Sequence, residues 1–222
     1  KKSGFPGVLG GVAMAIGFTA YVFAMSTTTV ANVLFIISTQ TIWLALFGYL
    51  FLKEKISLKT FLSIILAMIG ILVMVGGSLS TGSLFGNLVA LFIPINFAFL
   101  ILLIRKYSNL DLVPALFFGG LIIMVFSFFM TETIIISKHN LIVGFLLGSF
   151  QHAFGFLCIV IGARSIPAVV VGLLMLVETL LGPFWVWLFL NEIPPMSVFM
   201  GGGIIILAVI LKTLEQKFSK DS

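Results

Sequence analysis

Charged side chains are scarce in this sequence: Asp, Glu, Lys and Arg make up 9% of 222 residues, against roughly a quarter in soluble proteins. Hydrophobic residues make up 61%, and the mean hydropathy is +1.30. The formal net charge of +5 comes from basic residues that stand singly or in pairs between apolar runs. Because they form no continuous basic face, we expect no nucleic-acid partner. The composition predicts a membrane protein with several spans.

Cysteine and histidine are also rare. The single cysteine, Cys158, lies within an apolar run, so an intrachain disulfide is excluded and a packing role is favoured. No second histidine or carboxylate lies three or four residues from His152, which argues against a metal site. The sequence has no Ser-His-Asp or His-Glu-x-x-His pattern and no phosphate-binding loop after a strand. We therefore expect no catalytic residues and no cofactor, and ATP-driven transport by this chain alone is disfavoured.

Long apolar runs dominate the sequence. A helix rises about 1.5 Å per residue and the hydrocarbon core is about 30 Å thick, so each run can form a spanning helix. Eight such spans are predicted: Gly7–Met25, Thr28–Phe51, Leu58–Val75, Phe85–Ile104, Val113–Met130, Leu141–Ile161, Ile166–Leu190 and Met196–Leu211. The predicted fold class is therefore all-α, a polytopic bundle of membrane helices.

The distribution of positive charge predicts the orientation. If the N-terminus is cytoplasmic, the eight spans put eleven Lys and Arg residues on the cytoplasmic side and only Lys138 on the other. We expect a multi-pass protein of the cell inner membrane, in contact with the lipid bilayer, with both ends of this chain cytoplasmic.

One stretch of the sequence recurs. Thr28–Ser57 aligns without gaps with Ile166–Pro195, at a constant offset of 138 residues. The polar pairs in this alignment are Gln40 with Glu178, Thr41 with Thr179, and Glu54 with Glu192. Five predicted crossings separate the copies, and an odd number inverts the second copy. This is the inverted-topology plan of many secondary transporters.

The repeat predicts the domain organisation. A complete second repeat of five helices occupies residues 83–212, and the last three helices of a first repeat occupy residues 1–77. Residues 213–222 form a cytoplasmic tail. A symmetric design requires two more helices ahead of the first three, so a fragment of a ten-helix protein explains the count better than a natural short form.

Several local motifs resemble the drug/metabolite transporter superfamily, specifically its EamA-type members. Leu176-Val177-Glu178 is similar to the Leu-Glu-Pro helix, Phe189-Leu190-Asn191-Glu192 and Phe51-Leu52-Lys53-Glu54 to the helix-ending Leu-Gly-Glu signature, and Gly201–Ile206 and Ala67–Ile71 to the glycine-rich helices that end each repeat. Thr179 departs from the pattern, since proline commonly follows the glutamate. The resemblance implies ten helices in two inverted five-helix repeats. It also implies transport of small metabolites, amino acids or drugs through a central cavity by alternating access, with export the expected direction.

Polar side chains at mid-depth are the candidate site. Four of them lie about eleven to thirteen residues into their spans: Gln40, Asn96, His152 and Glu178. Transporter sites lie near the midplane at the repeat interface, so a shared depth is the expected signature of one cavity. Gln151 borders His152, and Trp43 lies one turn from Gln40. We expect these six residues to bind substrate or couple its movement to an ion.

Each of these residues also has a structural interpretation. Glu178 is either a proton-coupling carboxylate or a hydrogen-bonded link between helices. His152 either relays protons, since histidine exchanges them near neutral pH, or bonds a neighbour. Gln40 and Asn96 either contact substrate or make interhelical hydrogen bonds. Glu54 and Glu192, at helix ends, are expected to join loop amides or lysines.

Two other functions stay open at this point. An intramembrane lipid-modifying enzyme could use His152 and Glu178 as an acid/base pair, which requires them within about 3 Å of each other or of a shared water. A non-transporting membrane scaffold would have no cavity. The oligomeric state, monomer or homodimer, is also open.

Overall fold

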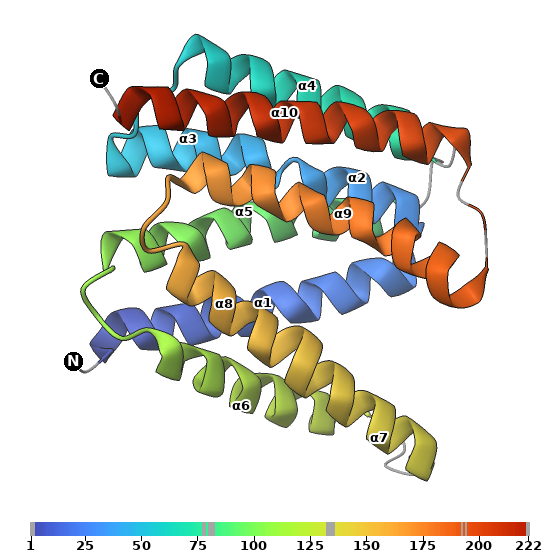
Figure 1. Cartoon of the computed structure of the whole chain (residues 1–222). Coiled ribbons are helices and arrows are strands. Elements are labelled where there is room, and N and C mark those ends of the chain that lie inside the picture. The colour runs from blue at the N-terminus through green and yellow to red at the C-terminus, as the bar shows by residue number, and fades with distance from the viewer. Residues whose placement is uncertain are drawn as a thin grey trace.

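The computed structural model describes residues 3–76, 79, 83–131, 136–191, 193 and 195–220, without the side chains of 179, 180, 182, 183, 186, 190 and 215–220. Glu192 lies outside the described residues. The described secondary structure is helical: α1 (Gly4–Thr27), α2 (Val30–Ser38), α3 (Gln40–Leu52), α4 (Leu58–Val75), α5 (Leu84–Lys106), α6 (Val113–Met130), α7 (Lys138–Leu146), the π-helix η2 (Leu147–Phe154), α8 (Gly155–Gly162), α9 (Ala168–Leu190) and α10 (Met196–Lys220). They form one elongated bundle (Figure 1).

The polytopic helical fold is confirmed. Seven described segments are long and apolar enough to cross a membrane, and the described part of α9 adds an apolar helix over Ala168–Glu178. The bounds of α4 and α6 agree with the predicted spans. The predicted spans Phe85–Ile104 and Gly7–Met25 are each extended by one to three residues at both ends.

Two predicted spans are not uniform helices. The predicted span Thr28–Phe51 corresponds to one candidate span, Val30–Leu52, whose helix is interrupted at Thr39. There the Ser38 and Thr39 hydroxyls donate to the carbonyls of Leu34 and Ile36, at 2.7 and 2.6 Å. Hydroxyl groups that bond back to the preceding turn compete with the helix and bend it. The span predicted over Leu141–Ile161 contains the π-helix η2 in its middle.

Helices α4 and α10 pack as an antiparallel pair at small residues. A Cβ atom added to Gly201 would lie 2.7 Å from the Met74 Cβ and would also collide with the Gly70 carbonyl oxygen. Ala67 and Ala208 in the same interface are fully buried. Near the other end of the pair, the buried Lys212 ammonium donates to the Thr60 hydroxyl at 2.6 Å. Small residues allow the close backbone approach on which helix association in lipid depends.

Helices α3 and α9, which belong to the two copies of the repeated motif, also run antiparallel. A Cβ atom on Gly172 would lie 2.9 Å from the Cα atom of Thr41, and one on Gly48 would lie 3.4 Å from the Cβ of Ala168. Gly48, near the end of α3, therefore faces Ala168 at the start of α9. Figure 1 shows the same opposition of chain direction across the centre of the bundle.

One end of the bundle carries the N-terminus, the α3–α4 and α5–α6 connections and the start of α9, at the left of Figure 1. We call it the basic end, because Lys53, Lys55, Arg105, Lys106 and Arg164 lie in or beside these connections. Lys138 begins α7 at the opposite end. The predicted segregation of positive charge is therefore a property of the folded chain.

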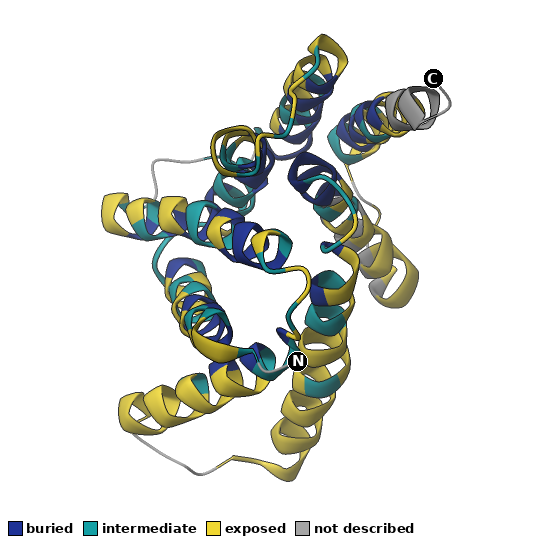
Figure 2. Cartoon of the chain, turned by 90° about the vertical axis from the view of Figure 1, so that its left-hand side faces the viewer, coloured by how far each residue is buried: buried dark blue, intermediate teal, exposed yellow. Residues whose placement is uncertain are grey.

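The helices differ in how far they are covered. Half of an 18-residue stretch in α5 is buried, but only 11% of α6, and α7 and η2 have no buried residue. Seen along the bundle, the helices at the lower edge are almost wholly exposed (Figure 2). Because their exposed side chains are apolar, this surface suits lipid or further helices rather than water.

The α4–α10 contact makes the first prediction. Gly201→Ala should destabilise the protein by about 1–3 kcal/mol, the usual cost of overpacking, because its Cβ meets fixed backbone of α4. Gly203→Ala is the matched control, since nothing lies within 4 Å of its Cβ. Thermal unfolding in detergent should show a lower Tm for Gly201→Ala only. Equal Tm values for the two variants would contradict this packing.

Candidate functional site

Helix α1 lies between the elements that carry His152 and Glu178. The Phe18 ring is 5.0 Å from the His152 ring in η2 and 4.9 Å from the Phe156 ring in α8, centroid to centroid. Tyr21, one turn further along α1, interacts electrostatically with Glu178 of α9. Thus α1 brings one face of aromatic side chains to both predicted residues.

Glu178 lies on α9 with its side chain exposed. One turn earlier on the same helix, Met175 packs against the hydrophobic core. A carboxylate at this depth is by default a functional candidate. The charge of Glu178 acts on Tyr21 of α1, so the two side chains belong to the same, otherwise apolar, section of the bundle.

A dense apolar core fills the bundle between Glu178 and the basic end. Its buried members come from five elements and include Leu44 of α3, Ile101 of α5 and Val171 of α9. The aromatic side chains that pack on it without being fully buried include Phe18, Trp43, Phe97 and Phe156. The site is thus layered, with Tyr21 and Glu178 one helical turn beyond the side chains that rest on the core.

Gln40 and Trp43 belong to the first turn of α3. Gln40 is buried, with 7% of its surface exposed, and follows directly on the helix interruption at Thr39. Trp43 is half-buried and its ring is 6.3 Å from that of Phe47. Transporter sites are commonly built where membrane helices are discontinuous. The break beside Gln40 therefore keeps this residue a candidate for the site.

Asn96 makes the interhelical hydrogen bond that was one of its two interpretations. Its side-chain amide donates to the carbonyl oxygen of Ala13 on α1 at 2.8 Å. The same amide nitrogen lies 2.6 Å from where a Cβ on Gly17 would be, so Gly17 makes room for it. Asn96 therefore ties α5 to α1 instead of pointing freely into the bundle.

The predicted residues do not all meet. Gln151 and His152 are exposed on η2, and within the described part of the chain no hydrogen bond or ion pair joins His152 to Glu178. The acid/base pair that an intramembrane enzyme would need has no supporting contact. Among the described residues there is also no cluster of three His, Cys, Asp or Glu side chains that could hold a metal ion.

Sequence reasoning missed three features of this region. Tyr21 is a lone tyrosine in an apolar run. Its place one turn after Phe18 is the one sign that both side chains lie on the same face of the helix. The break at Thr39 has a visible signal in the pair Ser38-Thr39 before Gln40. The π-helix around His152 has none, although such segments are frequent at functional sites.

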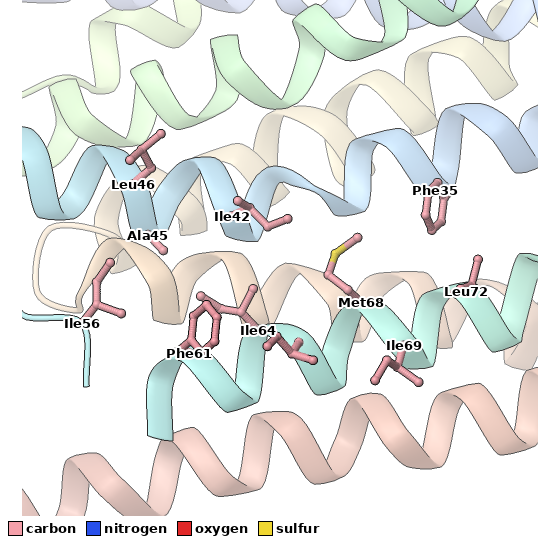
Figure 3. Close-up of a pocket in the computed structure, with 11 residues that line it drawn as sticks. Phe35, Ile42, Ala45, Leu46, Ile56, Phe61, Ile64, Met68, Ile69 and Leu72 are labelled. Atoms are coloured by element: carbon pink, nitrogen blue, oxygen red, sulfur yellow. The ribbon is translucent and has the colours of Figure 1, made fainter. Parts of the chain in front are cut away.

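A separate hollow lies on the outside of the bundle between α2, α3 and α4. It measures about 490 Å³ and its lining is apolar, including Phe35, Ile42 and Met68 (Figure 3). None of the predicted site residues lines it. An apolar groove on an apolar outer surface is suited to lipid tails and is not the candidate site.

An all-helical bundle of long apolar helices, packed antiparallel at small residues, is a multi-pass membrane protein. Its sequence matches the EamA-like transporter family over residues 2–76 and 80–214. The chain therefore belongs to the EamA-like transporter family, which confirms the resemblance and makes the protein a membrane transporter.

Two relatives agree with this assignment. An uncharacterized transporter of Clostridium kluyveri is 25% identical over 234 residues, which cover 98% of this chain and 74% of that protein. A solved structure titled "Crystal structure of protein" superimposes with a TM-score of 0.77 at 13% identity, covering 94% of this chain and 88% of the other. The second likeness concerns the fold alone.

The Asn96 bond makes the second prediction. Asn96→Ala should lower stability by about 0.6 kcal/mol and at most about 2, as measured for hydrogen bonds between membrane helices. Asn109→Ala, in the exposed α5–α6 connection, is the control. Thermal unfolding in detergent measures both. If Asn96→Ala left the Tm unchanged but abolished transport, Asn96 would be a substrate contact and not a helix link.

Proposed function

We propose that this protein is a secondary transporter that moves small organic solutes across the cytoplasmic membrane by alternating access, with export as the direction and Glu178 coupling solute movement to protons. The observation that carries the proposal is the match of the chain to the EamA-like transporter family over residues 2–76 and 80–214. The part given to Glu178 is supported by its exposed place on α9, where its charge acts on Tyr21 of α1. The two residues come from opposite halves of the chain, and Glu178 lies in the middle of α9. A solute that passes between α1 and α9 would therefore meet a carboxylate.

Antiparallel pairing supports the alternating-access part of the proposal. The pair α3 and α9 and the pair α4 and α10 each join related segments that run in opposite directions. Two inverted copies around one site give a bundle two related conformations, each open to one side. In this proposal, the packed core towards the basic end and the exposed Glu178 beyond it would belong to the conformation that is closed at the basic end.

The orientation in the membrane follows from charge. Because cytoplasmic connections carry an excess of Lys and Arg, we assign the basic end to the cytoplasm. Both ends of this chain are then cytoplasmic. In this orientation Glu178 and Tyr21 are on the route to the outside.

Two further helices complete the repeat in this proposal. Under the offset of 138 residues, the counterpart of α1 is the segment from α7 to α8. Helices α5 and α6 cover α1, whereas α7 and η2 have no buried residue. A helix pair related to α5 and α6 by the repeat would cover that bare face. This pair would also enclose His152 and Gln151.

Glu178→Gln makes the third prediction. Full-length protein in proteoliposomes should lose transport driven by a pH gradient, to near the level of empty vesicles, because the amide cannot exchange a proton. The solute is the one that a metabolite-loss screen of cells with and without the protein identifies. Tyr21→Phe should reduce transport less, since it removes only the hydroxyl.

Asp111→Asn is the matched control for this experiment, since it also neutralises one carboxylate but at the exposed start of α6. It should transport like the unchanged protein. Undiminished, still pH-dependent transport by Glu178→Gln would remove Glu178 from the mechanism.

A further inference from the structure

The Glu54 carboxylate joins three helices at the basic end. One of its oxygens lies 2.6 Å from a terminal guanidinium nitrogen of Arg105, at the end of α5. Both oxygens accept from the backbone N–H of Ala168, the first residue of α9, at 3.3 and 3.0 Å. The carboxylate itself belongs to the residue that follows the C-cap of α3. It therefore links the ends of α3 and α5 to the beginning of α9.

Local backbone geometry delivers the carboxylate to this position. Lys53 is left-handed, with φ of 55°, and the Glu54 N–H donates to the Gly48 carbonyl at 3.0 Å. This reversal folds the Glu54 side chain back along the last turn of α3. A Cβ on Gly48 would lie 2.7 Å from the carboxylate, so glycine is needed beside it.

The charges in this contact are complementary and partly shielded. The N-terminus of α9 carries free N–H groups and the positive end of the helix dipole, both of which favour an anion. The Arg105 and Glu54 side chains are 19% and 17% exposed. The other two guanidinium nitrogens of Arg105 are buried and have no hydrogen-bond partner in the described part of the chain. Among the described residues, Glu54 is thus the ion-pair partner that holds Arg105.

The contact of Glu54 with Arg105 and Ala168 lies next to the dense apolar core. Ala168 belongs to that core, together with Ile104 of the turn before Arg105 and Leu44 of the turn before Gly48. At the opposite end, a polar cluster joins Thr28, Asn32 and Asn87, which belong to the segments α1 to α2 and α5. That cluster does not include α9. Among the described residues, the hydrogen bond that joins α9 to the other helices runs from the Ala168 N–H to the Glu54 carboxylate.

We propose that Glu54 is a gating residue: its bonds to Arg105 and to the N-terminus of α9 hold the basic end closed, and they break when that end opens. This inference rests on the proposed alternating-access function. The apolar packing of Val171 and Leu44 tolerates small shifts of the helices, whereas the bonds of the Glu54 carboxylate to its two donors require one arrangement. When α9 separates from α3 and α5 at this end, these bonds must break.

Cysteine accessibility tests the gate without reference to any solute. In full-length protein with Cys158→Ser, Val171→Cys reports on the closed core, since Val171 is 5% exposed. Tyr21→Cys, in a second version, reports on the other side. A membrane-impermeant maleimide is added to inside-out vesicles for the first and to intact cells for the second.

Glu54→Gln should raise the labelling rate of Val171→Cys by about tenfold, the shift in a two-state equilibrium that corresponds to about 1.4 kcal/mol. It should lower the labelling of Tyr21→Cys at the same time, because one side closes as the other opens. Arg105→Gln removes the ion pair but leaves the bond to Ala168, so it should change both rates in the same directions by less. If Glu54→Gln fails to fold, Arg105→Gln decides.

Asp111→Asn is again the matched control, because Asp111 pairs with Arg164 at the same end across 3.6 Å with half of its side chain exposed. It should leave both labelling rates unchanged. Variants of Glu54 and Arg105 that label like this control would overturn the gate. A rise in labelling at both reporters would also overturn it, since general loosening is what a merely structural residue produces. Failure of the transporter proposal is read separately, from the solute flux of Glu178→Gln.

Discussion

Close approach of antiparallel helices at glycine and alanine is the constraint on which this bundle depends. Lipid tails are as apolar as leucine, so burial of apolar surface does not pull membrane helices together as it does in water. Contact between α4 and α10 instead depends on Gly70, Gly201 and their small neighbours. Contact between α3 and α9 depends on Gly172 and Gly48. Where these residues stand decides which helices touch, and hence which side chains share the interior.

The two kinds of contact in the protein have different consequences for motion. Contacts at small residues such as Gly70 and Gly201 are van der Waals contacts between closely spaced helices. The Glu54 contact is directional and short, and it fixes one end of α9 relative to α3 and α5. Other interhelical bonds, such as Asn96 to Ala13 and Lys212 to Thr60, join other helix pairs. In the proposed cycle, α9 would be held at the basic end and released there when the gate opens.

Much of the fold could be predicted from the sequence, because membrane helices are recognised by the length and hydropathy of their apolar runs. The bounds of α4 and α6 follow from polar breaks at both ends. The opposite directions of α3 and α9 follow from the motif and the number of crossings between its copies. The break at Thr39 and the π-helix at His152 could not be predicted, since each depends on local hydrogen bonds that compete with an otherwise suitable helix.

The candidate site was less predictable than the fold. Depth selected Asn96 and Glu178 alike, but it does not give direction around a helix, and Asn96 turns to the α1 backbone. Tyr21 was passed over because an aromatic side chain in an apolar run has no distinguishing pattern. Glu54 was expected to join loop amides or lysines. Its partners are instead an arginine and the first amide of a helix far along the chain, which pairwise reasoning along a sequence does not reach.

The interruption at Thr39 makes the two copies of the motif mechanically unequal. The first copy consists of two short rods, α2 and α3, whereas α9 is one rod of 23 residues. In the proposed transport cycle, the interruption allows a change of angle between α2 and α3 while α3 stays docked beside Gly172. Helix α9 has no such interruption between Ala168 and Glu178. In that cycle the two related segments would therefore differ in stiffness.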